Sequence, residues 1–264
     1  MPGVVLITGA SSGIGEALAV EYARRGHDLA LLARREERLA AVSAAVQQAG
    51  RRAVPIQCDV REDDSVRRAV DQAVQAFGKL DVVIANAGFG VSGRFERLTL
   101  DDYRRQFETN VFGVLRTIQA TLPALGLSRG RLAIMGSVAG YLAAIGMSPY
   151  AMSKFAIRGL ADSLREDLRP LGVSVTLISP GFVDSEIRRL DRQGVFRQDS
   201  PDPVPAWLRV PAPVAARHIV RAIDRRQREA VITVHGKAMV LLARHAPWAI
   251  RSLTRILAPK VRKV

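Results

Sequence analysis

The chain has 264 residues, 48% of them hydrophobic, and its one cysteine, Cys58, excludes a disulfide framework and gives no metal-ligand spacing. This size favours one large domain, and no apolar stretch reaches the roughly 18 residues of a membrane-spanning helix. The formal charge is +14, but many of the arginines are interleaved with acids along predicted helices, which disfavours a nucleic-acid-binding surface. The start lacks a signal-peptide pattern, so we expect a cytoplasmic protein.

Short apolar runs alternate with amphipathic segments along most of the chain, which is typical of a parallel sheet covered on both faces. The predicted strands cover residues 4–8, 29–32, 53–56, 82–85, 132–135, 173–178 and 230–234. The predicted helices cover residues 14–25, 36–49, 65–77, 100–122 and 150–168. The predicted fold class is therefore α/β, with a doubly wound, Rossmann-type sheet of about seven strands in a single domain.

Two segments depart from this alternation. Residues 182–213 contain five prolines and little periodicity, which predicts a long excursion that could act as a lid. We expect residues 1–235 to form the Rossmann-type dinucleotide-binding and catalytic domain, and residues 236–264 to form a basic, amphipathic C-terminal extension. The extension has no acidic residue, and five apolar residues share one helical face: Ala249, Ile250, Leu253, Ile256 and Leu257. It could bind an anionic membrane surface or pack on protein.

Glycines cluster where the first predicted strand turns into the first predicted helix. The segment reads Gly9-Ala10-Ser11-Ser12-Gly13-Ile14-Gly15. Glycines allow a tight turn and a close approach of backbone to a pyrophosphate, and the helix N-terminus supplies amide donors. Because strand, loop and helix come in the order that a dinucleotide site needs, we expect a cofactor site here and not a bare structural turn.

The residues after the second strand discriminate between the two nicotinamide cofactors. An acid there would hold the ribose hydroxyls of NAD, whereas arginine suits the 2′-phosphate of NADP. The chain has Ala33-Arg34-Arg35. We therefore expect NADP (NADPH), with Arg34 as the phosphate clamp, Arg35 as its helper, and Ser11 or Ser12 as lesser donors. The alternative is that both arginines are solvated residues that open the next helix.

A tyrosine and a lysine, Tyr150 and Lys154, stand four residues apart in a predicted helix. This spacing places the phenol and the ammonium on one helical face, where the cation would lower the pKa of the tyrosine toward the working pH. A tyrosine in that setting can give or accept a proton. The pair therefore predicts acid–base chemistry.

Taken together, these motifs resemble the short-chain dehydrogenase/reductase family, in its order and spacing, from the first strand to about residue 185. The matching elements are Thr8-Gly9, Gly13-Ile14-Gly15, Asp59-Val60, Asn86-Ala87-Gly88, Asn110, Ser137, Tyr150 with Lys154, and Pro180-Gly181. The two arginines and the basic tail place the chain in an NADP-preferring branch with a C-terminal extension.

The resemblance implies further contacts with the cofactor. Asp59, with Val60 beside it, would hold the adenine amino group, and Asn86-Ala87-Gly88 would brace the sheet next to the cofactor. The segment Pro180-Gly181-Phe182-Val183-Asp184-Ser185 would form the turn over the nicotinamide. Ser185 stands where the family usually has threonine, and its hydroxyl would keep the contact with the carboxamide.

The resemblance also implies the catalytic roles. Tyr150 would exchange a proton with the substrate oxygen while hydride moves between the substrate carbon and the nicotinamide. Lys154 would lower the pKa of Tyr150 and bind the nicotinamide ribose, and Ser137 would orient the substrate oxygen. Asn110 would hold a water that links Lys154 to solvent, although a solvent-facing Asn110 is the alternative. No metal is implied.

The predicted function is NADP(H)-dependent interconversion of a ketone or aldehyde and an alcohol. A lipophilic substrate is favoured because residues near the site by motif position are mostly apolar: Phe89, Val138, Ala139, Tyr141, Leu142, Met147, Phe182 and Val183. These residues could equally be ordinary core. The alternative function is a non-catalytic NADPH-binding regulatory module. The family often forms dimers and tetramers, so we expect a homodimer or homotetramer, with membrane association an alternative to a purely cytoplasmic location.

Overall fold

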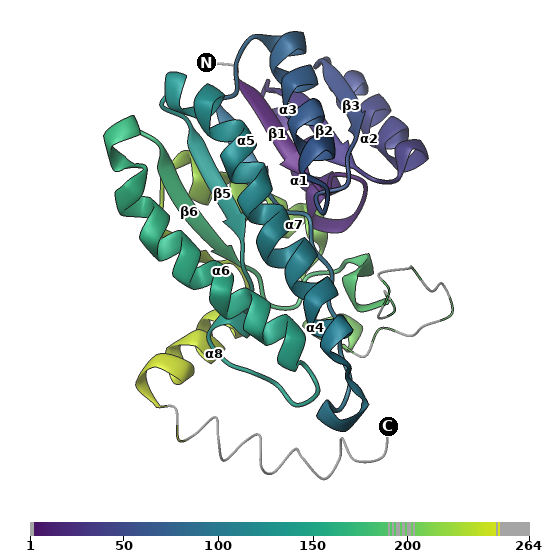
Figure 1. Cartoon of the computed structure of the whole chain (residues 1–264), viewed down its shortest axis with the longest axis vertical. Helices are drawn as coiled ribbons and strands as arrows, with labels where there is room; N and C mark the ends of the chain where they lie inside the picture. The colour runs from purple at the N-terminus through teal and green to yellow at the C-terminus, as the bar shows by residue number, and fades with distance from the viewer. Residues whose placement is uncertain are drawn as a thin grey trace.

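A single parallel sheet forms the centre of the molecule (Figure 1). The computed structural model describes residues 3–189 and 204–246, together with residues 191, 193, 196, 199, 202 and 248. The strands are β1 (Val4–Thr8), β2 (Asp28–Ala33), β3 (Ala53–Gln57), β4 (Val82–Ala85), β5 (Arg131–Met135), β6 (Ser174–Ser179) and β7 (Glu229–Val231). Their order across the sheet is β3-β2-β1-β4-β5-β6-β7. This order confirms the predicted doubly wound α/β fold, with a last strand shorter than predicted.

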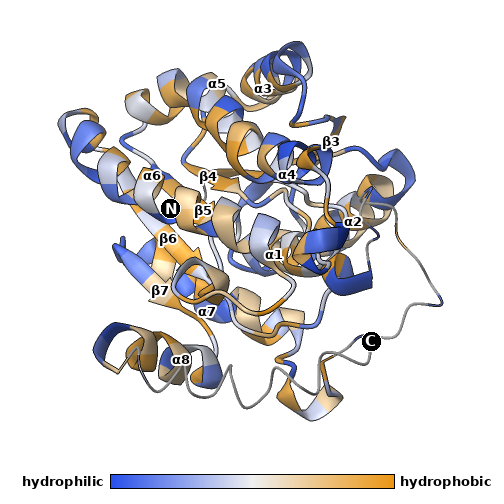
Figure 2. Cartoon of the chain, turned by 60° about the horizontal axis from the view of Figure 1, so that its bottom comes forward, coloured by the Kyte–Doolittle hydropathy of each residue, from blue (hydrophilic) through white to orange (hydrophobic). Residues whose placement is uncertain are grey.

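Helices cover both faces of the sheet because its strands are apolar on both sides. The α-helices are α1 (Gly13–Arg24), α2 (Glu36–Gln48), α3 (Asp63–Phe77), α4 (Leu100–Phe107), α5 (Gly113–Leu127), α6 (Ser148–Asp167), α7 (Ala212–Asp224) and α8 (Val234–His245). In β1, Val4 and Leu6 pack in the cluster that contains residues of α3, α5 and α6, whereas Val5 and Ile7 pack with α1, α2 and α7. In Figure 2 the central strands are hydrophobic and hydrophilic residues concentrate on the outer turns of helices.

The single helix predicted over residues 100–122 is divided in the structure. Between α4 and α5 lies one π-helical segment, Glu108–Phe112. A π-helical turn holds an extra residue and is frequent at functional sites. Here it contains Asn110, which is completely buried.

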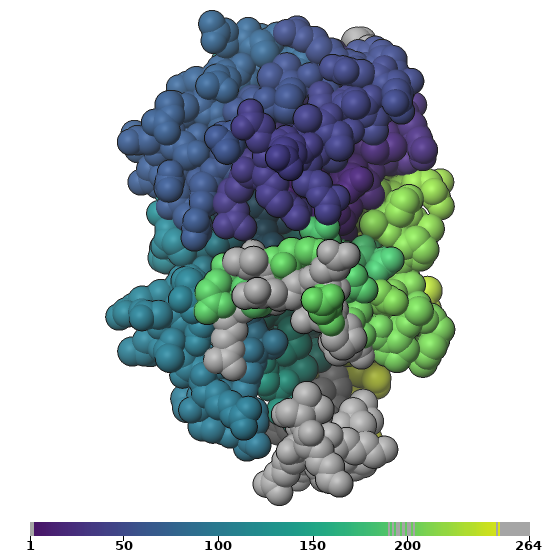
Figure 3. Space-filling model, turned by 90° about the vertical axis from the view of Figure 1, so that its right-hand side faces the viewer, coloured from purple at the N-terminus to yellow at the C-terminus, as the bar shows by residue number. Residues whose placement is uncertain are grey.

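The predicted excursion after β6 is a real irregular segment. In its described part, Val183 pairs with Val210 in an isolated bridge, and short 3-10 helices form at Glu186–Arg189 and Ala206–Leu208. The segment ends earlier than predicted because α7 begins at Ala212, with Pro213 in its first turn, where proline is well tolerated. In Figure 3 the green residues of this segment lie across the face between the purple and blue first part of the chain and the teal region.

The predicted domain boundary at residue 235 falls inside α8. The Thr233 hydroxyl caps this helix by accepting a hydrogen bond from the Gly236 amide at 3.1 Å. Val240 then packs in a buried cluster with Val138 and Tyr141. The first part of the extension therefore belongs to the domain, while residues 249–264, on which the predicted amphipathic helix falls, lie outside the described residues. None of the described helices is both long and apolar enough to span a membrane.

Candidate active site

The glycine loop is shaped so that only glycine fits at its key positions. Gly9 and Gly13 have φ of +67° and +58°, in the left-handed region that disfavours other residues. A Cβ atom at Gly15 would lie 2.2 Å from the Gly9 carbonyl oxygen. Ser12 precedes α1, but its side chain makes no capping hydrogen bond, so the first amides of the helix are left to another acceptor. An anion such as a pyrophosphate fits this arrangement.

Asn86 fastens the glycine loop to the end of β4. Its Nδ2 donates hydrogen bonds to the carbonyl oxygens of Thr8 and Gly9, at 2.9 and 3.2 Å. In return, the amides of Asn86 and Ala87 donate to the Thr8 hydroxyl, at 3.0 and 3.1 Å. The structure thus shows the bracing contacts that the resemblance implied for this turn, which continues into Gly88.

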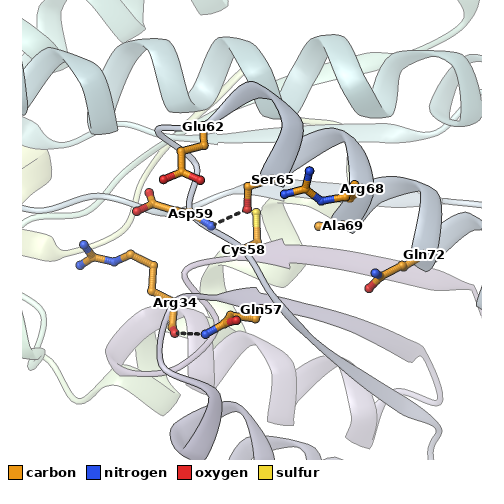
Figure 4. A pocket seen from close by; sticks show the side chains of 9 residues that line it. All are labelled: Arg34, Gln57, Cys58, Asp59, Glu62, Ser65, Arg68, Ala69 and Gln72. Atoms are coloured by element: carbon orange, nitrogen blue, oxygen red, sulfur yellow. Dashed lines mark hydrogen bonds between the residues drawn. The ribbon is translucent and has the colours of Figure 1, made fainter.

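A hollow of about 550 Å³ opens beside the ends of β2 and β3 (Figure 4). Its lining residues are Arg34, Gln57, Cys58, Asp59, Glu62, Ser65, Arg68, Ala69 and Gln72. Asp59 pairs with Arg61 at 2.6 Å, while Val60 packs beneath Gly113 of α5. Burial raises the pKa of the Cys58 thiol to about 11, which fits a packing role. The hollow places Arg34 and Asp59, two predicted cofactor residues, at one site.

Arg35, and not Arg34, touches the glycine loop. Its guanidinium donates to the Ser12 hydroxyl at 2.8 Å and to the Ser11 hydroxyl at 3.3 Å. The same group forms an ion pair with Glu186 at 2.9 Å, and Arg38 pairs with the other oxygen of that carboxylate at 3.3 Å. We call Arg34, Arg35 and Arg38 the arginine rim. It brings positive charge to the two loop serines and to the hollow.

Tyr150 lies where α6 meets the 3-10 turn Val138–Gly140 that follows β5. The turn packs closely on α6, since a Cβ atom at Gly140 would lie 2.8 Å from the Lys154 carbonyl oxygen. The Ser137 side chain lies near the half-buried Tyr150 phenol, and its influence lowers the pKa of that phenol. The Ser137 oxygen also accepts from the Ala139 amide at 3.1 Å. The predicted pair of Tyr150 and Ser137 is thus assembled.

Lys154 is buried beneath Tyr150, with 5% exposure. Its Nζ donates to the Met135 carbonyl oxygen at 2.8 Å and lies 5.7 Å from the centre of the Tyr150 ring. Burial lowers the pKa of Lys154 to about 8.

The expected lowering of the Tyr150 pKa by Lys154 does not appear. Burial raises the pKa of Tyr150 above its ordinary value, and the influence of Ser137 and the charge of Arg188 offset this only in part. The physical reason is that Lys154 directs its Nζ to the Met135 carbonyl oxygen at the end of β5, and its Nζ lies over the face of the Tyr150 ring.

Asn110 reaches into the molecule from the π-helical segment. Its Oδ1 accepts from the Phe89 amide at 3.0 Å, and its Nδ2 donates to the Phe89 carbonyl oxygen at 3.0 Å and to the Ser153 hydroxyl at 3.2 Å. Its complete burial is opposite to the solvent-facing alternative. Asn110 therefore connects the segment that follows β4 to α6, at the residue that precedes Lys154. We call Asn110, Ser137, Tyr150 and Lys154 the Tyr150 cluster.

The turn after β6 joins the two halves of the site. The Val138 amide, next to Ser137, donates to the Pro180 carbonyl oxygen at 3.0 Å. Ser185, five residues after Pro180, lies against the glycine loop. A Cβ atom added at Gly13 would lie 3.1 Å from the Cβ atom of Ser185. Val183, between Pro180 and Ser185, is buried. The predicted turn therefore spans from the Tyr150 cluster to the glycine loop.

Two residues that contact this turn were missed by the sequence reasoning. Thr233 and His235 lie more than 50 positions downstream of Gly181 and Phe182, yet they pack directly on them. No motif or periodicity in the sequence indicates this contact, because it joins residues that are far apart in the chain. Two predicted pocket residues, Val138 and Tyr141, belong instead to the core cluster under α8.

Comparison with known proteins agrees with this geometry. A family model described as "short chain dehydrogenase" matches residues 3–195. The chain belongs to the short-chain dehydrogenase family. Its curated relatives include "11-beta-hydroxysteroid dehydrogenase 1A" from Arabidopsis thaliana, 39% identical over 240 residues, and an "Uncharacterized oxidoreductase" from Myxococcus xanthus, 39% identical over 183 residues. The first alignment covers 85% of this chain and 66% of the plant protein, and the second covers 69% and 72%.

Solved structures of this family superpose over nearly the whole chain. A short-chain dehydrogenase/reductase from Burkholderia phymatum in complex with NAD has a TM-score of 0.83 and 27% identity, and covers 95% of each chain. An alcohol dehydrogenase from Thermococcus sibiricus complexed with 5-hydroxy-NADP has a TM-score of 0.77 and 28% identity, with 88% of this chain and 96% of that one covered. The chain therefore belongs to a family in which solved structures contain nicotinamide nucleotides.

Proposed function

We propose that this short-chain dehydrogenase reduces a lipophilic ketone or aldehyde with NADPH, or oxidises the matching alcohol with NADP. The observation that carries the proposal is that Tyr150 and Ser137 lie together with the buried Lys154, whose Nζ bonds to Met135 at the carboxyl end of β5. In open α/β sheets this edge is where ligands bind. The plant relatives named as hydroxysteroid dehydrogenases support a carbonyl and alcohol reaction.

The bound nicotinamide would supply or accept a hydride at the substrate carbon. The protein side of the reaction is proton transfer: Tyr150 gives its phenolic proton to the developing oxyanion, and Ser137 holds that oxygen by a hydrogen bond. Lys154 provides a positive charge under the ring of Tyr150, and Asn110 fixes α6 at that point. A water between Lys154 and solvent, held by Asn110, would return the proton.

The raised pKa of Tyr150 predicts how the two directions of the reaction depend on pH. Burial keeps the phenol protonated, which is the form that can donate a proton to a carbonyl oxygen. Oxidation needs the phenolate, so its rate should increase with pH. The charge of Arg188 and the influence of Ser137 favour that phenolate.

NADP is the proposed cofactor because the rim after β2 carries arginines and no acid. Arg34 borders the hollow that suits the adenosine, and Arg35 already contacts the loop serines. Asp59 borders the same hollow, and Val60 is the next residue in the chain. The turn Pro180–Ser185, which includes Val183 and Ser185, would cover the nicotinamide. The related structures contain NAD in one case and 5-hydroxy-NADP in the other, so the preference needs its own test.

The proposed test uses the purified wild-type chain and a panel of ketones, aldehydes, alcohols and sugars, followed by NADPH absorbance. We expect turnover with hydrophobic carbonyl compounds and little with phosphorylated sugars. Binding of NADPH without turnover of any panel member would favour the alternative, a non-catalytic NADPH-binding regulatory module. Absence of NADPH binding would contradict both functions.

Assembly and location are part of the same proposal. Exposed apolar residues on the α5 and α6 side, including Phe112, Met152 and Phe155, support a homodimer or homotetramer. On α8, Leu241 and Leu242 are also exposed, which supports a docking or membrane-facing role for residues 236–264. Light scattering of the full chain tests the assembly. Sedimentation with anionic liposomes, compared with a chain ending at residue 248, tests whether a cytoplasmic protein attaches to membranes through its tail.

A further inference from the structure

The C-terminal helix α8 reaches the turn after β6 through one histidine. The Phe182 amide donates a hydrogen bond to His235 Nε2 at 2.9 Å. The two aromatic rings are also stacked, with centroids 5.2 Å apart and an interplanar angle of 21°. Phe182 lies at the centre of the turn that runs from the Ser137 side of the site to the glycine loop.

The contact is close enough to restrict the sequence of the turn. A Cβ atom at Gly181 would lie 2.2 Å from the Thr233 hydroxyl and 2.6 Å from His235 Nε2. Gly181 is therefore required by the approach of α8, since the backbone of the turn presses on these two side chains. The Thr233 hydroxyl, which caps α8, also lies 3.0 Å from His235 Nε2.

The chemistry of the contact determines the form of the imidazole. A backbone amide can only donate, so Nε2 must be the accepting nitrogen and the ring proton must be on Nδ1. Burial lowers the pKa of His235, which keeps the ring neutral near pH 7. The amide of Phe182 would lose its acceptor if Nε2 were replaced by carbon.

We propose that His235 is a positioning residue of the active site, which holds the turn over the nicotinamide through the Phe182 amide. The inference rests on the proposed function, because the turn matters only if it covers a nicotinamide nucleotide. It also assigns a role to α8. The helix, which begins at the Thr233 cap, holds His235 against the turn and so supports the site. The family-model match ends at residue 195, well before this support.

Three variants separate the acceptor from the ring. His235→Phe keeps a ring that can stack on Phe182 but has no accepting nitrogen. His235→Gln keeps an acceptor, because its Oε1 can reach the position of Nε2. His245→Phe is the matched control, since His245 is exposed at the end of the same helix.

The first measurement is hydrogen–deuterium exchange of the Phe182 amide in the purified full chain without nucleotide. We expect exchange to be faster in His235→Phe by about tenfold or more, and close to the wild type in His235→Gln and His245→Phe. Equal exchange in His235→Phe and the wild type would overturn the inference. This measurement is independent of whether the protein uses NADP.

The second measurement compares the dissociation constants of NADP and of adenosine 2′,5′-bisphosphate, which lacks the nicotinamide half. We expect His235→Phe to weaken NADP binding about five- to tenfold and to leave the fragment within twofold, with His235→Gln restoring NADP binding. Equal weakening of both ligands, or of neither, would overturn the role of His235 in the site. If the wild type binds neither ligand, the proposed function fails, and exchange at Phe182 still decides whether His235 holds the turn.

Discussion

The Tyr150 cluster and the arginine rim lie in the same site but are built in opposite ways. Asn110 and Lys154 are buried and bond to backbone groups of neighbouring elements. The side chains of Arg35 and Arg38 are 41% and 54% exposed, and they share a single carboxylate, Glu186. Buried groups with fixed partners are costly to alter, whereas exposed ion pairs contribute little and exchange partners easily. The cluster should therefore determine the reaction, and the rim should adjust which cofactor is preferred.

The largest expected effect is the loss of the Tyr150 hydroxyl. Tyr150→Phe should lower kcat by roughly 10²- to 10⁴-fold, the usual contribution of a positioned proton donor. NADPH binding, measured by fluorescence, should stay within about threefold because the ring and Lys154 remain.

Tyr103→Phe is the matched control. It removes a tyrosine hydroxyl that lies 2.7 Å from the Ser148 hydroxyl, at the start of the helix α6 that also contains Tyr150. We expect it to keep most of the activity. Substantial turnover by Tyr150→Phe would refute the proton-transfer role and with it the contrast between cluster and rim.

The second effect is a pH dependence of stability that comes from Lys154. Burial lowers its pKa to about 8, below the value of about 10.4 for a lysine in the unfolded chain. Between about pH 8 and pH 10 the unfolded state therefore binds more protons, and the free energy of unfolding should increase with pH. Compared with Lys154→Met, which lacks the titrating group, the wild type should gain on the order of 2 kcal/mol over that range.

Urea unfolding of both proteins at several pH values measures this difference. Other titrating groups, Tyr150 included, affect both proteins, so only the difference between the two curves reports on Lys154. Parallel curves from about pH 7 to pH 10 would mean that the ammonium is not desolvated as the structure indicates.

The sequence predicts the cluster far better than the parts around it. The strands are almost continuous apolar runs and were predicted closely. Gly9 and Ser137 belong to local motifs that follow strands, and Tyr150 belongs to a motif with helical spacing near the start of α6, so their places in the fold could also be predicted. The support by His235 could not be predicted, because it depends on where α8 packs after more than 50 intervening residues. The division of the helix around Asn110 was missed for a related reason, since a π-helical turn leaves the apolar periodicity almost unchanged.

The third effect concerns the rim and divides its two leading arginines. From the sequence we expect Arg34 to be the main phosphate clamp, whereas the structure shows Arg35 on the loop serines. Arg34→Ala and Arg35→Ala should each raise the KM for NADPH about tenfold and leave the KM for NADH within about twofold, with the larger effect identifying the clamp. Arg104→Ala, at an exposed position of α4, is the control. Equal changes for NADPH and NADH would show that neither arginine reads the 2′-phosphate.

The smallest effect should come from Glu186, the carboxylate that now occupies the rim. Its two oxygens pair with Arg35 and Arg38, so a 2′-phosphate near Arg35 must share or displace this acid. Glu186→Gln should therefore tighten NADPH binding by about two- to threefold more than NADH binding, and the gain should shrink at high salt, where exposed charges are screened. Asp184→Asn removes the same charge from the same segment, but Asp184 pairs with Arg209 outside the rim, and it should leave the preference unchanged. If Glu186→Gln instead weakens both cofactors equally, the ion pair serves to hold the turn near the glycine loop, and the rim is part of the rigid site after all.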